Sequence, residues 1–304
     1  MRGNVYKAFV LLLPLIGLAG AGKAQQLPQY SQYMFNRYYN NPAVAGSEDV
    51  SFASLGYRAQ WAGLKGAPTT SMAAFHTAFK ENVGLGGMLF TDKNGPFRRS
   101  GLRLSYAYQL KVSDKTKLGL GLAGVLYQHS LNKENLDPRT EGDPALNGEK
   151  RKSIDPDGIF GAYLSGADYY VSFTSSHLFK SEMFGDSLGG TQLSRHFYLG
   201  GGYAFDLSKK WELEPSVMMR ATKGAPLHFD INGKLLYDDL VWTGISYRSS
   251  GSLLAMLGLQ KGQLRIGYSY DLTLSEIRNY SSGSHEIHLG MKIPSGKSVK
   301  FPSF

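Results

Sequence analysis

Short segments in which apolar and polar side chains alternate recur along most of the chain. Leu102–Leu110 reads LRLSYAYQL, and Leu227–Tyr237 and Leu264–Leu272 follow the same scheme. Because successive side chains of a strand point to opposite faces, a period of two gives each strand one apolar and one polar face. Repeated alternating segments of about ten residues are the sequence signature of a transmembrane β-barrel. We therefore predict an all-β fold.

The alternating segments predict about fourteen strands, an even number that brings both ends of the chain to one side of a closed antiparallel barrel. They lie near residues 50–59, 68–79, 83–91, 99–111, 116–129, 158–165, 168–178, 194–206, 210–222, 226–236, 239–248, 252–260, 262–273 and 284–293. The longer connections follow odd-numbered strands, at Trp61–Ala67, Asp92–Arg98, Ser130–Asp157, Phe179–Leu193 and Leu274–Gly283. Since outer-membrane barrels have short periplasmic turns and longer outside loops, we expect both termini to be periplasmic.

The charged residues of the polar face indicate which face meets lipid. An Arg at the bilayer midplane costs roughly 2–4 kcal/mol on the lipid face of a barrel. The summed cost of placing several such residues in lipid would exceed the stability of about 5–15 kcal/mol that folds usually have. The charged residues expected in the lumen are Arg103, Glu212, Arg220, Asp230, Arg248, Arg265, Asp271 and Lys292. A soluble two-sheet sandwich, which would bury the aromatic face instead, is the alternative.

The first residues have the features of a secretory signal peptide. Arg2 and Lys7 give a positively charged start, the apolar run Ala8–Leu18 follows, and Gly22-Lys23-Ala24 fits a small-x-small cleavage site. The run is short for a membrane-spanning helix, although a retained anchor is the alternative. The domains expected are a signal peptide at 1–24, an N-terminal segment at 25–49, a barrel at 50–293 and a tail at 294–304.

The stretch Gln29–Gly46 has no period of two and reads QYSQYMFNRYYNNPAVAG. Pro42 disfavours an α conformation at Asn41, so a helix through this point is not expected. Tyrosines mixed with amides suit a segment packed against a polar wall rather than in a dry core. We predict that it plugs the lumen or docks a periplasmic partner; packing against the barrel mouth is the alternative. The residues expected to do this are Tyr30, Gln32, Tyr33, Phe35, Asn36, Asn41 and Pro42.

Charge and cysteine content exclude several classes of protein. The formal net charge of +9 is spread without long runs of one sign, so the sequence predicts no nucleic-acid partner. The absence of cysteine rules out a disulfide scaffold and thiol chemistry.

Two short motifs resemble cofactor or metal sites. Gly119–Gly124 matches GxGxxG but lies inside an alternating segment, without the helix N-terminus that a dinucleotide site needs. We expect its glycines to share one face and to leave room in a crowded lumen. His285 and His288 flank Glu286 three residues apart on an expected strand, so they point to opposite faces and predict no zinc site. No cofactor is expected.

Acidic residues gather in the longest expected loop, Ser130–Asp157. Asp137, Glu141, Asp143, Asp155 and Asp157 lack EF-hand spacing, so we expect a solvated loop rather than a Ca²⁺ site. No GxSxG or SxxK motif supports a nucleophile, and no catalytic residue is predicted. An outer-membrane hydrolase with a Ser/His pair on one rim is left open.

Several stretches together resemble the PorP/SprF outer-membrane proteins of the Bacteroidota type IX secretion system. They are SQYMFNRYYNNPAVAG (Ser31–Gly46), YRAQWAGLKGAPTT (Tyr57–Thr70), SYAYQL (Ser105–Leu110), SRHFYLGGGYAFDLS (Ser194–Ser208), EPSVMMR (Glu214–Arg220), WTGISYRSSGS (Trp242–Ser252), GYSYDLTLS (Gly267–Ser275) and GSHEIHLG (Gly283–Gly290). They follow the family order over nearly the whole mature chain. The chain departs from the family by continuing through PSGKSVKFPSF at its end.

The resemblance implies a non-enzymatic barrel required for export or surface retention of adhesins that carry a C-terminal sorting domain. The resemblance also implies that some members serve gliding motility and that others function beside the periplasmic ring of the secretion machine. A barrel of about fourteen strands has a narrow lumen that holds a plug or peptide but passes no folded protein. We therefore predict an anchor or accessory receptor embedded in outer-membrane lipid. A passive or substrate-specific channel is the alternative.

Overall fold

The computed structural model describes residues 30–48, 50–132, 151–183 and 191–294. The expected signal peptide, residues 25–29, and the C-terminal tail beyond residue 294 lie outside these ranges, as do Asp137, Glu141 and Asp143.

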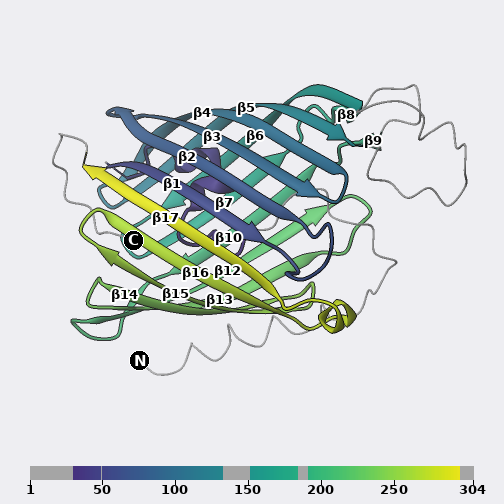
Figure 1. Ribbon diagram of the computed structural model, residues 1–304. Coiled ribbons are helices and arrows are strands. Elements are labelled where there is room, and N and C mark those ends of the chain that lie inside the picture. The colour runs from purple at the N-terminus through teal and green to yellow at the C-terminus, as the bar shows by residue number, and fades with distance from the viewer. Residues whose placement is uncertain (1–29, 49, 133–150, 184–190, 295–304) are drawn as a thin grey trace, which may run out of the picture.

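The described residues form a closed antiparallel barrel (Figure 1). Strand β1 (Val50–Ala59) pairs with β17 (Ser284–Pro294), and β10 (His196–Tyr203) pairs with β12 (Trp211–Thr222), which closes the wall. The short β11 (Phe205–Asp206) continues β10 along β12, so the fifteen strands of the sheet make a wall of fourteen. The other wall strands are β2 (Thr69–Lys80), β3 (Val83–Asn94), β4 (Phe97–Ser113), β5 (Thr116–Leu131), β6 (Arg151–Ser165), β7 (Tyr169–Ser176), β13 (His228–Tyr237), β14 (Val241–Arg248), β15 (Ser252–Lys261) and β16 (Leu264–Thr273).

The predicted architecture is confirmed, with corrections at two loops. The expected loop Asp92–Arg98 is wrong, because β3 and β4 continue to a tight hairpin at Gly95 and Pro96, where Gly95 has a φ of +56°. Strand β6 begins at Arg151, seven residues before its predicted start. Asp155 and Asp157 are therefore strand residues rather than loop residues, and Asp157 is buried.

Several smaller elements are not part of the barrel wall. A two-stranded ribbon of β8 (Glu182–Met183) and β9 (Thr191–Gln192) belongs to the connection between β7 and β10, and the sequence did not predict it. The described ranges also contain the 3₁₀ turns η2 (Arg37–Tyr39), η3 (Pro42–Val44) and η7 (Glu276–Asn279). Among the described residues, no helix has the length and apolar character needed to cross a membrane.

The two faces of the wall have the chemistry of a membrane barrel. On β4, Leu104 is 61% exposed on the outer face, whereas Arg103, on the inner face, is 4% exposed. Further apolar side chains exposed on the outside include Leu55, Phe75, Leu122, Ile245 and Leu257. A soluble protein buries such residues, so the sandwich alternative is wrong and the apolar band is the surface that lipid solvates.

The barrel has two unlike rims. Val50 pairs with Pro294 at the end that carries the short connections, for example 81–82, 114–115 and 262–263; we call this end the turn rim. The opposite end carries the connections 60–68, 132–150, 177–195 and 274–283, and we call it the loop rim. Figure 1 shows both rims, with β8 and β9 beside the loop rim.

Candidate functional site in the lumen

Residues 30–48, which we call the lumenal segment, run through the inside of the barrel from one rim to the other. At its start, the Tyr30 carbonyl accepts a hydrogen bond from Arg248, the last residue of β14 at the loop rim. Near its end, Gly46 packs on Gly84 beside the turn rim, at the start of β3. Figure 1 shows the short turns of this segment enclosed by the wall.

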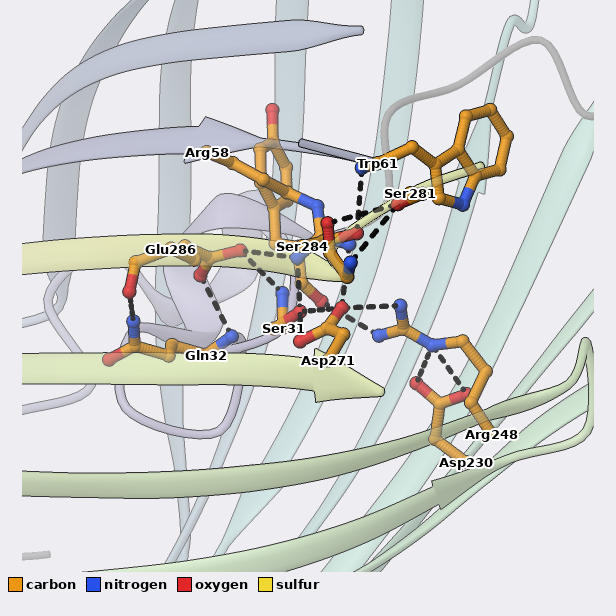
Figure 2. Close-up of polar contacts among 12 residues, drawn as sticks. Ser31, Gln32, Arg58, Trp61, Asp230, Arg248, Asp271, Ser281, Ser284 and Glu286 are labelled. Atoms are coloured by element: carbon orange, nitrogen blue, oxygen red, sulfur yellow. Dashed lines mark hydrogen bonds and ion pairs between the residues drawn. The ribbon is translucent and has the colours of Figure 1, made fainter. Parts of the chain in front are cut away.

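A buried carboxylate holds the first residues of the lumenal segment by their backbone. The Glu286 carboxylate accepts hydrogen bonds from the backbone N–H groups of Ser31 (2.8 Å) and Gln32 (2.9 Å). The Gln32 side-chain amide in turn donates to the Glu286 backbone carbonyl at 3.1 Å. Figure 2 shows these contacts between the segment and β17. The pattern binds an extended peptide through its backbone, and hydrogen bonds to a charged group are stronger than neutral ones.

The same carboxylate belongs to a buried ion cluster. Arg58, near the end of β1, donates to Asp271 of β16 at 2.6 Å and contacts Glu286 at 3.4 Å. The Ser31 hydroxyl donates to Asp271 at 2.8 Å and accepts from Arg58. The three charged side chains are at most 3% exposed. Removing one member of such a cluster leaves the others buried without compensation.

Arg248 extends the cluster around the wall. Its Nε donates to both Asp230 carboxylate oxygens at 3.3 Å, and its guanidinium lies 3.8 Å from Asp271. Arg220 also donates to Asp230, at the Oδ1 atom that Arg248 contacts as well. We call Arg58, Arg248, Asp230, Asp271 and Glu286 the clasp; it joins β1, β13, β14, β16 and β17 at the loop rim (Figure 2).

The middle of the lumenal segment is held by hydrogen bonds to opposite sides of the wall. Arg103 of β4 donates to the carbonyls of Tyr38 (2.7 Å) and Tyr39 (2.9 Å). The Tyr38 hydroxyl donates to Ser105 of β4 at 3.0 Å. Across the lumen, the Tyr33 hydroxyl accepts from Asn232 of β13 at 2.7 Å.

Aromatic and ionic contacts complete the middle layer. The Phe35 ring stacks on Trp242 of β14 with centroids 3.6 Å apart. Arg37 pairs with Glu214 of β12, and its guanidinium lies 3.9 Å from the centroid of the Tyr170 ring. These contacts explain why the segment combines tyrosines with charged and amide residues: many of the polar tips meet a polar group of the wall while the rings fill the space.

The end of the lumenal segment sits on glycines. The side-chain amide of Gln109 donates to the carbonyls of Ala43 (2.9 Å) and Ala45 (2.7 Å). A Cβ on Gly84 would lie 1.9 Å from the Ala45 carbonyl oxygen, and one on Gly121 would lie 2.4 Å from the Ala43 nitrogen. We call Gly84, Gly121 and Gln109 the seat, because they let the backbone of the segment approach the backbone of the wall.

Asn41 links this end to the far wall. Its side-chain amide donates to the Ala162 carbonyl at 2.9 Å and to the Ser172 hydroxyl at 2.9 Å, and its oxygen accepts from Ala43. It thereby caps η3, where Pro42 occupies the first position.

All seven predicted residues of the lumenal segment lie inside the barrel. Tyr30, Gln32, Tyr33, Asn36, Asn41 and Pro42 are buried, and Phe35 is partly buried against Trp242. The structure brings Tyr30 and Gln32 to the clasp and Asn41 and Pro42 to the far wall beside the seat.

The eight charged residues expected in the lumen lie on the inner face. Asp230, Arg248 and Asp271 form most of the clasp, and Arg220 adjoins it. Lys292 pairs with Glu48 at 3.3 Å near the turn rim. Arg103 binds the segment, Arg265 lies 5.9 Å from the Phe52 ring, and Glu212 is half-buried on the face that carries Glu214.

The sequence missed several residues that hold the segment. Arg58 and Glu286 occupy inner positions of alternating strands, so the same parity argument that found Arg103 could have found them. Gln109 also lies on the polar face of its strand. Nothing in the pattern of single strands distinguishes Gly84, because its role depends on which part of the segment lies above it.

The glycine motif Gly119–Gly124 is placed differently from its prediction, whereas His285 and His288 lie on opposite faces as predicted. Gly119 and Gly121 face the lumenal segment, but Gly124 lies on the outer face, so the expectation that the three glycines share a face is wrong. Gly124 is three residues from Gly121, and residues an odd number apart on a strand point to opposite faces. His288 is buried in the lumen and His285 contacts Tyr268 on the outside, as predicted. Within the described ranges, no group of three or more His, Cys, Asp or Glu is arranged to hold a metal ion.

Little space is left between the lumenal segment and the wall. Three cavities lined by residues of the segment have volumes of about 50, 60 and 20 Å³. A cavity needs about 10–15 Å³ of such space for one water, so each of the three holds only a few waters.

The sequence matches one family model along most of its length. The family is described as "Type IX secretion system membrane protein PorP/SprF", and residues 22–291 match it. No curated protein matches the sequence significantly.

Solved structures support the barrel fold. The toluene transporter TbuX of Ralstonia pickettii is 12% identical, with a TM-score of 0.53 over 86% of this chain and 93% of that chain. A FadL homologue of Pseudomonas aeruginosa is 11% identical, with a TM-score of 0.50 over 88% of this chain and 95% of that one. At such low identity the similarity concerns the outer-membrane barrel alone.

Proposed function

Because the chain belongs to the PorP/SprF family of type IX secretion system membrane proteins, we propose that it is an anchor or accessory receptor in the outer membrane. In this role it assists the export or surface retention of adhesins that carry a C-terminal sorting domain. We propose no catalytic role, since both the family and the fold are those of membrane components.

The observation that carries this proposal is the filled lumen. The lumenal segment contacts the wall from Tyr30 to Glu48, and the cavities beside it have volumes of about 20–60 Å³. A passage for a folded adhesin would be far wider than these cavities. We therefore propose that the adhesin is held or guided at a rim of the barrel and crosses the membrane elsewhere in the machine.

The proposal includes the processing of the chain and its partners. Residues 1–24 act as a cleaved signal peptide, residues 25–49 form the N-terminal segment, residues 50–293 the barrel, and residues 294–304 a periplasmic tail. Pro294 lies at the turn rim, where periplasmic ring subunits of the machine can reach the barrel. Outer-membrane lipid solvates the apolar outer face.

Deleting the gene tests the proposal. We expect large adhesins to be lost from the cell surface, by failed export or by release into the medium, and gliding to be lost where the cells glide. Complementation with the intact gene is the control and should restore the surface adhesins. Unchanged location and amount of every adhesin in the deletion strain would contradict the proposal.

A channel function would give a different result. Purified protein in planar bilayers should then conduct ions without any change to the lumenal segment, and loss of the gene should impair uptake of a solute rather than the display of adhesins.

A further inference from the structure

The direction in which the lumenal segment crosses the barrel has a topological consequence. Its first described residues lie in the clasp: Ser31 and Gln32 bind Glu286, two residues into β17 from the loop rim. Its last residues lie at the other end: Glu48 pairs with Lys292, two residues from the end of β17 at the turn rim. The segment therefore enters at the loop rim and leaves at the turn rim.

The loop rim is the outer one by the lengths of its connections. It carries the connections 60–68, 132–150, 177–195 and 274–283, whereas most connections of the turn rim are two to four residues long. Outer-membrane barrels place long loops outside and short turns in the periplasm.

We infer that the chain upstream of Tyr30 leaves the barrel through the loop rim, so that the mature N-terminal end is presented at the outer surface of the cell. The sequence predicted a periplasmic N-terminus because the first strand starts at the turn rim. Residues 30–48, however, cross the lumen from the loop rim to the turn rim, so the N-terminal end lies on the opposite side of the barrel from the start of β1.

Distance prevents a return to the periplasm. From Glu286 to Pro294, β17 advances eight residues, which is about 26 Å along the strand and about 20 Å along the barrel axis at a tilt of about 40°. With the cleavage after Ala24 proposed above, on which this step rests, five residues, 25–29, remain upstream of Tyr30 and reach at most about 18 Å when fully extended. Within the part of the chain that the structure describes, the segment itself occupies the lumen, and the cavities beside it have volumes of about 20–60 Å³.

The point of exit lies beside a braced part of the loop rim. The Ala62 N–H donates to the Gly283 carbonyl at 2.7 Å, and the Ser282 N–H donates to the Ala62 carbonyl at 2.8 Å. The Trp61 N–H donates to the Ser284 hydroxyl at 3.0 Å, next to the clasp (Figure 2). A protein bound at the outer surface would thus meet the end of the segment and these two loops together.

Labelling with a membrane-impermeant maleimide on intact cells tests the inference. The chain contains no cysteine, so a single introduced thiol is the only one labelled in this protein. Gln29→Cys is the test variant and Gln26→Cys a second one. Lys65→Cys, exposed in the connection 60–68, and Lys209→Cys, exposed at the turn rim, are the matched controls. Heat-modifiable migration in electrophoresis verifies that each variant forms a barrel.

We expect Gln29→Cys and Gln26→Cys to be labelled on intact cells to the same extent as Lys65→Cys, and Lys209→Cys only after lysis. Labelling of both glutamine variants only after lysis, while Lys65→Cys reacts on intact cells, would overturn the inference. Labelling of Lys209→Cys but not Lys65→Cys on intact cells would also overturn it, because the loop rim would then face the periplasm. None of these results depends on whether adhesins are secreted.

Discussion

The clasp and the seat hold the two ends of the same segment by different means. At the loop rim, Glu286 and its charged neighbours bind the backbone of Ser31 and Gln32 through charge-assisted hydrogen bonds. At the turn rim, Gly84 admits the Ala45 carbonyl to a distance that no side chain would allow. The first end is held by charged groups, and the second by close backbone packing together with the hydrogen bonds from Gln109.

The difference indicates how each end responds to change. Every member of a buried ion cluster depends on the others, so the clasp fails when one charge is removed. The two glycines of the seat tolerate no added volume, because backbone stands on both sides of the contact.

The largest effect on stability is expected from Glu286→Ala. It leaves Arg58 without one of its carboxylate partners and two backbone N–H groups without an acceptor. Breaking a buried ion pair in this way costs about 3–5 kcal/mol. Urea unfolding of the barrel in detergent micelles measures the loss. Glu276→Ala, at an exposed acid of the same rim, should change stability by less than about 0.5 kcal/mol. Equal effects of the two substitutions would show that the clasp contributes nothing.

A smaller loss is expected from Gly84→Ala. The added Cβ would lie 1.9 Å from the Ala45 carbonyl oxygen, so the segment must shift. Overpacking of this kind costs about 1–3 kcal/mol. Gly124→Ala is the control, because a Cβ there has no neighbour within 4 Å. The same unfolding assay applies, and a Gly84→Ala barrel as stable as the Gly124→Ala barrel would mean that the segment is not seated on β3.

The smallest effect is expected from Tyr33→Phe, in the layer between the clasp and the seat. It removes the acceptor of the 2.7 Å hydrogen bond from Asn232 and keeps the ring. Such a bond contributes about 0.5–1.5 kcal/mol. Tyr106→Phe, whose ring lies on the outer face, should be close to neutral in the same assay. A larger loss of stability for Tyr33→Phe than for Glu286→Ala would contradict the expectation that the clasp contributes more than the middle layer.

The wall was predictable from sequence because its physics is local. Each strand faces lipid on one side and the lumen on the other, so β4 and β16 could be found from their own residues, and the inward position of Arg103 and Asp271 followed from the cost of charge in lipid. The tightness of the hairpin at Gly95 was missed because Asn-Gly-Pro also reads as a loop.

The start of β6 was missed for a structural reason. Pro156, Asp155 and Gly158 read as turn residues, yet β6 pairs with β7 only from Ile159 onward. Residues 151–158 thus have β5 as their wall partner on one side, and proline is tolerated on such an edge.

The clasp and the seat could be predicted only in part. The alternation places Arg58, Glu286 and Gln109 on the inner face, but most of their partners lie far away along the chain, 255 residues for Glu286 with Ser31 and 64 for Gln109 with Ala45. Which wall group meets which residue of the segment depends on the closure of the barrel, and no periodicity within one strand records that.

The central claim, that the lumenal segment seals the barrel, is tested most directly by ion conductance in planar bilayers. The intact protein and a variant that lacks Tyr30–Asn41 are compared at equal amounts, after both have been shown to migrate as heat-modifiable barrels. We expect the intact protein to give little or no conductance and the deletion variant to give clear conductance steps. Steps of the same size from the intact protein would contradict the claim.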